Sequence, residues 1–422
     1  MGGAREVAAR GPVTHGTQEA GTAGFDGWAP VALDAVLGRV AVGLADVGAR
    51  FPLSADPDTG TWTTTRRGSW TGGFWAGLLW LRARHTGAAA DRAAAEACTV
   101  RLADWAGADT ATRGLILWYG TALAPDSDPA TRLRARAAGT CLTAYDPRLG
   151  LVPWGDAFGG PRALARADAV PGLVPLLASA GPRGREAATS HLERHVDLCL
   201  GAVEETPPPV AGPDGETPPP VAGPDGGSAP VPLRAAAWRH EPGTGWRPLA
   251  VPPAGWSRGR AWLLLAVADA LTLPGGPAGA PARLRAVARH LGAPLATTPA
   301  PGADTASAPP RPLVPPADEA RPDGPSDTSA AAITAVALLK LAALPGGEAC
   351  GRRAEAVLRH LVTAHLSGDG GGGGGRPPSG MLLDGCHDAA TGTAVRHELV
   401  WGDFFLALGL AALTGLVDLR DV

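Results

Sequence analysis

Tryptophan is the residue type that most clearly marks where chemistry could occur in this chain. There are 13 Trp against 2 Tyr and 6 Phe. Six of them stand at predicted helix starts or in the preceding loops: Trp70, Trp75, Trp154, Trp256, Trp262 and Trp401. Loops at one end of a scaffold are where sites are built, and a flat indole face matches the CH-rich face of a sugar ring. The pattern indicates a carbohydrate cleft, with core packing as the alternative for each Trp.

Charged residues accompany the tryptophans in the same segments. Asp168 and Asp327 stand at predicted helix starts, where each could be only an N-cap. Arg258 lies between Trp256 and Trp262. Its forked, permanently charged donor set suits a carboxylate ligand, and a salt bridge to a structural carboxylate is the alternative.

Metal and phosphate chemistry find little support in the sequence. His191 and His195 are four apart on a predicted helix, but they lack the HExxH pattern and a third ligand, so we expect a solvated helix face. The five cysteines form no CxxC motif. The glycine run 370–375 is followed by Arg376-Pro377 rather than by Lys-Ser or Lys-Thr, as in a phosphate loop. We therefore expect no metal and no cofactor.

Helical periodicity dominates the chain. Apolar residues recur at three and four positions in twelve segments, and no convincing series of alternating strands is present. Asp128 is a candidate N-cap before Pro129, and Gly87 is a candidate helix stop. The segments are 31–50, 72–86, 88–105, 113–123, 128–143, 168–179, 183–203, 257–271, 281–291, 327–343, 348–366 and 403–413. They predict one large all-α domain whose helix count suits a ring of six helix pairs.

The predicted domain spans residues 28–422, after a loose tail at 1–27. Three Pro- and Gly-rich insertions interrupt it, at 204–231, 299–325 and 367–380, and the first contains a tandem copy of ETPPPVAGPDG. These tracts are expected to be loops.

Composition and charge narrow the class of protein. Hydrophobic residues make up 45% of the 422 residues, which is enough for a sizeable core. The net charge of −3 gives no global basic field for nucleic acid. We find no secretory signal and no apolar run of the roughly 18–20 residues that span a bilayer. Widely spaced, odd-numbered cysteines fit reduced thiols, so we expect a cytoplasmic protein without membrane partners.

Five segments, in order, resemble the unsaturated glucuronyl hydrolases, glycoside hydrolase family 88. The family patterns are W-T-x-G-F-W-x-G, an Asp before an L-P-L-L-like run, W-[SA]-R-G-Q-A-W, D-S-S-A-A-A and W/Y-G-D-[YF]-[YF]. They correspond here to Trp70–Gly77, Asp168 before Leu173–Leu177, Trp256–Trp262, Asp327–Ala332 and Trp401–Phe405. The matches spread over roughly residues 30–415.

This resemblance implies an (α/α)6 barrel and a reaction. Family members remove a Δ4,5-unsaturated uronic acid from the non-reducing end of oligosaccharides left by polysaccharide lyases, by hydration of a vinyl ether. Asp168 matches the acid/base of the family, and Arg258 is the candidate for holding the substrate carboxylate. Trp70, Trp154, Trp256 and Trp262 are expected to line the cleft, and His240 falls near a substrate-contacting family histidine.

The chain also departs from the family pattern. Thr112 stands where a second family Asp is expected, and Asp109 could replace that residue only if its loop shifts. Arg260 replaces the family Gln, and the H-Q-G-Y stretch is not recognisable. Two other hypotheses therefore stay open: a catalytically impaired sugar-binding homologue, and a hydrolase or epimerase of saturated sugars on the same toroid.

Overall fold

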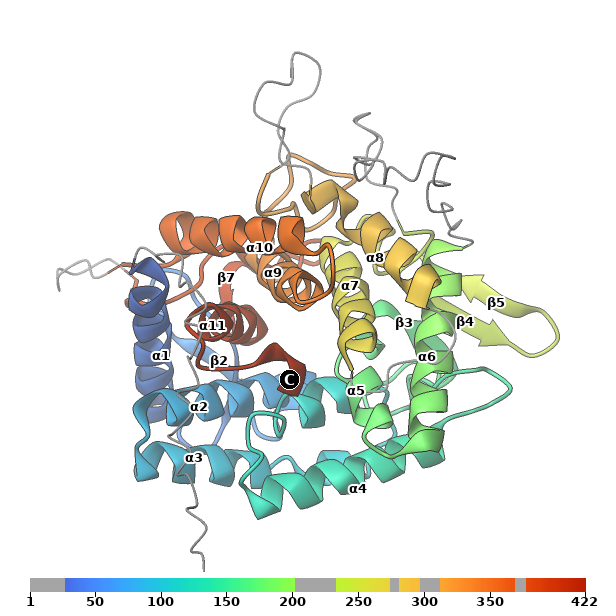
Figure 1. Ribbon diagram of the computed structural model, residues 1–422, viewed down its shortest axis with the longest axis horizontal. Helices are drawn as coiled ribbons and strands as arrows, with labels where there is room; N and C mark the ends of the chain where they lie inside the picture. Colours follow the sequence, from blue (N-terminus) through green and yellow to red (C-terminus); the bar gives the residue numbers. More distant parts are fainter. Residues whose placement is uncertain (1–26, 202–232, 274–280, 297–311, 369–376) are drawn as a thin grey trace, which may run out of the picture.

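Helices alternate between an outer and an inner ring along the chain (Figure 1). The computed structural model describes residues 27–201, 233–273, 281–296, 312–368 and 377–422. The outer ring consists of α1 (Trp28–Val47), α3 (Ala89–Val100), α4 (Asp128–Ala144), α6 (Pro182–Leu200), α8 (Pro281–Ala296) and α10 (Glu348–His360). The inner ring consists of α2 (Gly72–Thr86), the π-helical turn Gly114–Trp118, α5 (Leu173–Ala178), α7 (Ser257–Thr272), α9 (Thr328–Ala342) and α11 (Val400–Leu413). The predicted (α/α)6 barrel is confirmed, and each predicted helical segment has a counterpart.

The two rings differ in how their sequences are buried. The inner helices α9 and α11 are buried around almost their whole circumference, which their apolar composition allows. The outer helix α10 buries only a stripe, formed by Arg353, Ala354, Val357 and Leu358. A single apolar stripe is the pattern of a helix that faces solvent on its other side. The core therefore lies within the inner ring and between the rings.

Glycines allow the inner helices to approach closely. A Cβ added to Gly73 of α2 would lie 2.2 Å from the carbonyl oxygen of Leu115. A Cβ added to Gly77 would lie 2.4 Å from the Phe404 ring of α11. Both glycines belong to the segment Trp70–Gly77, so part of that motif serves packing.

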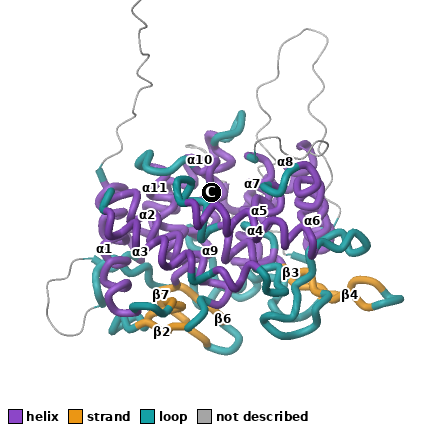
Figure 2. Tube along the Cα trace, turned by 90° about the horizontal axis from the view of Figure 1, so that it is seen from below, coloured by secondary structure: helices purple, strands orange, loops and turns teal. Residues whose placement is uncertain are grey.

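Within the described residues, seven short strands form two antiparallel sheets, and none of these strands was predicted from the sequence. One has the order β2-β1-β7-β6, the other β3-β4-β5. They comprise β1 (Phe51–Ala55), β2 (Trp62–Thr65), β3 (Leu164–Arg166), β4 (Ala237–Glu241), β5 (Gly245–Pro248), β6 (Gly385–Asp388) and β7 (Thr393–Leu399). Each is too short and too irregularly buried to show a period of two. Both sheets lie at one end of the helical ring, and the C-terminus lies at the other (Figure 2).

Helix ends agree with the sequence in two places and differ in one. Gly87 ends α2 in the left-handed conformation, and Asp327 caps α9 by accepting a hydrogen bond from the Ser329 amide at 3.1 Å. Asp128 is not the cap of α4; Ser127 is, and its side chain accepts from the Ala130 amide. Ser and Asp are equally good N-caps, so neighbouring candidates cannot be ranked from sequence.

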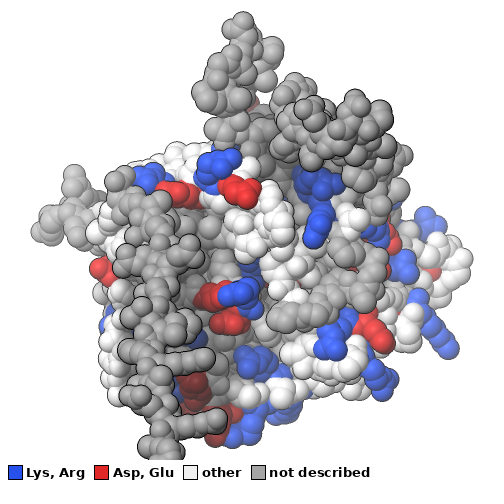
Figure 3. Space-filling model, viewed as in Figure 1, with Lys and Arg blue, Asp and Glu red and all other residues white. Residues whose placement is uncertain are grey.

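Other sequence expectations concern the surface and the ends of the chain. By length and composition, α1 is apolar enough to cross a membrane, so the expectation that no such run exists is wrong. In this structure α1 packs in the outer ring, and 44% of its 18-residue apolar window is buried. Acidic and basic side chains are interspersed on the face in Figure 3. The tail at 1–26, the tandem repeat and the glycine run lie outside the described residues.

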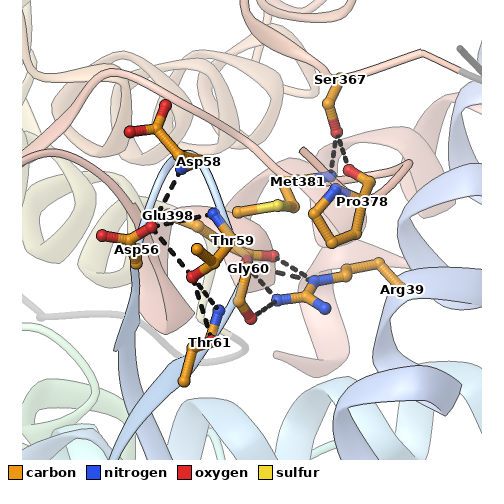
Figure 4. A network of polar contacts seen from close by, with 10 residues as sticks. All are labelled: Arg39, Asp56, Asp58, Thr59, Gly60, Thr61, Ser367, Pro378, Met381 and Glu398. Atoms are coloured by element: carbon orange, nitrogen blue, oxygen red, sulfur yellow. Dashed lines mark hydrogen bonds and ion pairs between the residues drawn. The ribbon is translucent and has the colours of Figure 1, made fainter. Parts of the chain in front are cut away.

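A buried charged cluster joins the first helix to the last part of the chain (Figure 4). Arg39 of α1 donates to Glu398 of β7 at 2.8 Å and to the Gly60 carbonyl at 2.8 Å. Burial raises the pKa of Glu398 to about 7, against the lowering effect of Arg39. Burial, and then the charge of Glu398, raise the pKa of Asp403 in α11 well above its ordinary value.

Candidate active site

A cleft of about 840 Å³ lies among the segments singled out by sequence. Its walls come from β3, β6, the turns before α2, α5 and α7, and the loop before α9, so it belongs to the strand end of the barrel (Figure 2). The sequence-predicted residues among those lining it are Trp70, Trp154, Asp168, Trp256, Arg258 and Trp262. Of these six residues, Trp70 and Trp262 lie 192 positions apart in sequence, yet both line the same cleft.

Asp168 is held on the cleft wall by an arginine two residues before it. It lies in the short 3-10 turn Ala167–Ala169, directly after β3. Arg166 donates to both carboxylate oxygens, from Nε at 2.9 Å and from Nη2 at 3.0 Å. Asp168 does not cap a helix: α5 begins after Gly172. The capping alternative is therefore wrong, and Asp168 is a cleft carboxylate in a bidentate ion pair.

The ion pair packs against an aromatic ring, that of Trp154. The Arg166 guanidinium lies 4.6 Å from the centre of the Trp154 ring, a cation–π distance. Burial opposes the charge on Arg166, but the nearby Asp168 outweighs it and raises the arginine pKa above its ordinary value. Trp154, Arg166 and Asp168 thus form one group of contacting side chains.

His191 contacts the backbone of both segments that carry Trp154 and Asp168. Its Nδ1 accepts from the Val152 amide at 3.1 Å, so its Nε2 carries the proton and faces the Ala169 carbonyl at 3.4 Å. His191 and His195 are both buried, so the prediction of a solvated helix face is wrong. Burial lowers the pKa of His195 to about 4 and that of His191 well below its ordinary value. Both rings are neutral and structural.

Arg258 also lines the cleft, but its guanidinium is engaged in structural contacts. Its Nη1 contacts Asp327 and the Cys386 carbonyl, each at 2.5 Å, and its Nη2 donates to the His387 carbonyl at 2.7 Å. The guanidinium also packs over Trp256 and Trp401. This buried pair joins α7, α9 and β6. The structure therefore favours the salt-bridge alternative over substrate binding for Arg258.

Other residues of the sequence motifs are buried next to the cleft and have structural roles. Trp401 is buried and donates from Nε1 to Ser329 at 2.9 Å, and Trp75 is also a core residue. Arg260 is buried and pairs with Glu319 at 3.1 Å. Glu319 belongs to the Pro-rich insertion, whose described part contributes Ala317 and Asp318 to the cleft. The described part of this insertion therefore forms part of the cleft wall.

Thr112 lines the cleft where the family pattern has its second aspartate. It is buried, and its hydroxyl lies 2.9 Å from the Thr110 hydroxyl. Asp109 does not replace the missing carboxylate, because Arg162 holds it from Nε at 2.7 Å and it is not among the residues that line the cleft. Asp168 lines the cleft without this second carboxylate of the family pattern.

His240 is not brought to the cleft. It lies on β4, facing the edge of Trp246 on β5 with ring centres 5.2 Å apart, and it is absent from the described lining residues. The expectation that it contacts substrate is wrong for this structure, because the β4–β5 hairpin projects from the ring beside α6 (Figure 1).

Several lining residues were not singled out from the sequence, among them Arg166, His387 and Asp388. His387 lies 6.1 Å from Trp70 and 5.3 Å from Trp401 between ring centres. Burial, and then the charge of Arg258, lower its pKa to about 4. Asp388 follows it and accepts from the Ala390 amide at 2.9 Å. The adjacent His-Asp pair was the available signal, but it lies on β6, a strand that was not predicted.

Within the described part of the chain, no group of three or more His, Cys, Asp or Glu side chains could hold a metal ion. The expectation of a metal-free and cofactor-free site stays a prediction.

Comparisons with known proteins agree on architecture. No protein-family model matches the chain, and no curated protein matches it. Among solved structures it is similar to the unsaturated glucuronyl hydrolase of Bacillus sp. GL1, responsible for the degradation of glycosaminoglycan, with 21% identity and a TM-score of 0.69 over 92% of this chain and 96% of that one. An unsaturated glucuronyl hydrolase specific for heparin gives 18% identity and a TM-score of 0.71 over 94% and 100%.

A third similar structure carries a sugar. It is a variant of the Streptococcus agalactiae unsaturated glucuronyl hydrolase complexed with dGlcA-GalNAc6S, with 17% identity and a TM-score of 0.63 over 90% of both chains. The likeness to these structures establishes the fold: the chain has the (α/α)6 barrel of the unsaturated glucuronyl hydrolases.

Proposed function

We propose that this protein is a glycoside hydrolase that removes a Δ4,5-unsaturated uronic acid from the non-reducing end of lyase-generated oligosaccharides. The observation that carries the proposal is the position of Asp168, on the wall of an 840 Å³ cleft that also includes Trp70, Trp154 and Trp262. A sugar-sized cleft with aromatic faces and a firmly held carboxylate at its wall is what this reaction needs. The shared fold and the ordered motifs support the assignment.

The reaction is the hydration of a vinyl ether. Asp168, in its protonated form, gives a proton to C4 of the C4=C5 double bond, and water adds to C5 while returning a proton to the carboxylate. The resulting hemiketal opens at C5, which leaves C1 as a hemiacetal that expels the remaining sugar. One water is consumed in total, and Asp168 ends in the state in which it began.

The substrate class is taken from chemistry and from the neighbours. The Bacillus relative acts in glycosaminoglycan degradation and the streptococcal variant holds a dGlcA-GalNAc6S unit, so glycosaminoglycan disaccharides are the first substrates to test. Five free thiols, at Cys98, Cys141, Cys199, Cys350 and Cys386, support a reducing compartment. We therefore propose that the enzyme acts in the cytoplasm on imported oligosaccharides.

Absorbance of the conjugated uronate double bond tests the proposal directly. Disaccharides released by polysaccharide lyases from several glycosaminoglycans are incubated with the protein, and hydration removes the absorbance. Loss of absorbance together with release of the second sugar supports the proposal. An unchanged spectrum across the panel contradicts it.

A non-catalytic sugar-binding role is the second candidate. Two observations favour it: Thr112 replaces a carboxylate, and both oxygens of Asp168 are engaged by Arg166. It predicts binding of the same disaccharides, measured by calorimetry, with no change in absorbance. Turnover of saturated disaccharides alone would instead indicate a hydrolase or epimerase of saturated sugars.

A further inference from the structure

Among the described residues, three arginines line the cleft, and two of them are poorly placed to bind an acidic sugar. Arg258 is 4% exposed and contacts Asp327 and two backbone carbonyls. Arg321 lies at the rim, 78% exposed, with its Nε 3.7 Å from Asp318. A fully committed guanidinium and a solvated one contribute little to recognition inside the site. The third arginine, Arg166, has neither limitation.

Arg166 is both fixed and accessible. Trp154 supports one face of its guanidinium, and Nε and Nη2 hold Asp168. Its remaining nitrogen, Nη1, makes no hydrogen bond to the described residues, and the side chain is 25% exposed towards the cleft. A fixed guanidinium with a free donor beside a reacting carboxylate is preorganised for a second anion.

We propose that Arg166 is the anchor for the carboxylate of the terminal sugar acid and bridges that group to Asp168. The inference rests on the proposed function and names the residue that selects its substrate class, a sugar ring bearing a carboxylate. It differs from the assignment by motif, which gives this role to Arg258. The bridge places the ligand's acidic group about one guanidinium width from Asp168.

The groups behind Asp168 supply no competing charge: burial lowers the pKa of His195 to about 4 and raises that of Cys199 to about 12, so both are neutral.

Binding of non-reacting sugars tests this inference separately from turnover. Isothermal titration calorimetry compares two saturated disaccharides, one ending in glucuronic acid and the other in glucose, on the wild-type protein and on Arg166→Gln. Glutamine can still hydrogen-bond to Asp168, but it has no charge. The matched control is Arg162→Gln, which removes an arginine that pairs bidentately with Asp109 outside the cleft.

The wild-type protein should bind the acidic disaccharide more tightly by about tenfold or more, as expected for a charge-assisted hydrogen bond. Arg166→Gln should abolish this preference, and Arg162→Gln should keep it. Arg166→Lys keeps the charge without the fork and should retain part of the preference, which guards against a folding defect in the glutamine variant. A preference that persists in a folded Arg166→Gln protein overturns the inference, as does a wild-type protein without preference. Neither result depends on the absorbance assay that tests the hydrolase activity.

Discussion

Replacing Asp168 with asparagine separates chemistry from structure in this site. Asparagine keeps the size of the side chain and can accept a hydrogen bond from Arg166, but it has no proton to transfer to C4. Turnover should fall by ~10²–10⁴-fold, the usual contribution of general acid–base catalysis. The ion pair that is lost is partly exposed, with side chains 25% and 19% accessible. Its loss should cost only about 1 kcal/mol of unfolding free energy.

The assay combines the loss of uronate absorbance with a thermal melt on the same preparations. Asp109→Asn is the matched control, because Asp109 also accepts a bidentate arginine but lies outside the cleft. The control should keep its turnover. An Asp168→Asn protein with full activity would remove Asp168 from the mechanism. Activity lost together with the folded state would leave only a structural role for it.

Three further predictions concern the scaffold. Asp403→Asn should melt at a higher temperature than wild type at pH 8, because burial raises the pKa of Asp403 and makes its ionised form destabilising. The difference should shrink as the pH falls and disappear only near about pH 3.9, the pKa of an Asp in the unfolded chain; parallel melting curves at every pH would contradict this. Wild-type stability should decline between about pH 4.5 and the folded pKa of Glu398, about 7, because a raised pKa makes the ionised carboxyl destabilising for the folded protein. Glu398→Gln should remove this part of the decline. Gly73→Ala should destabilise by about 3 kcal/mol or more in chemical denaturation, because its Cβ would meet the Leu115 carbonyl at 2.2 Å, whereas Gly38→Ala, with nothing within 4 Å, should be neutral or stabilising; equal effects would refute the packing argument.

Local signals in the sequence determined most of the helical scaffold. The bounds 72–86 follow from a run of apolar residues ended by Gly87, and they match α2. Asp327 was recognisable as a cap because a carboxylate before a helical run satisfies free amides within a few residues. The count of twelve helical segments indicated the number of helix pairs, since each segment carries its own 3.6-residue pattern.

The candidate site was only partly readable. The ordered tryptophans and Asp168 were found because their types are distinctive, and the cleft gathers Trp70, Trp154, Trp256 and Trp262 around it. His387 and Asp388 were missed because they lie on β6, and a strand of four residues leaves no periodic trace.

Tertiary structure alone decided the partners of the charged groups. Asp327 lies 69 residues from Arg258 in the sequence. Their pairing gives Arg258, which was the candidate substrate ligand, a structural role in the cleft wall. Arg166 was not singled out beside Asp168 in the sequence. In the fold its guanidinium packs on the Trp154 ring at the cleft, so it is the cation that can still contact a ligand. His191 looked solvated but is buried between two loops. Spacing along the chain fixes which residues share a helix, whereas burial and pairing depend on contacts between distant segments, and those contacts decide which charge remains available to a ligand.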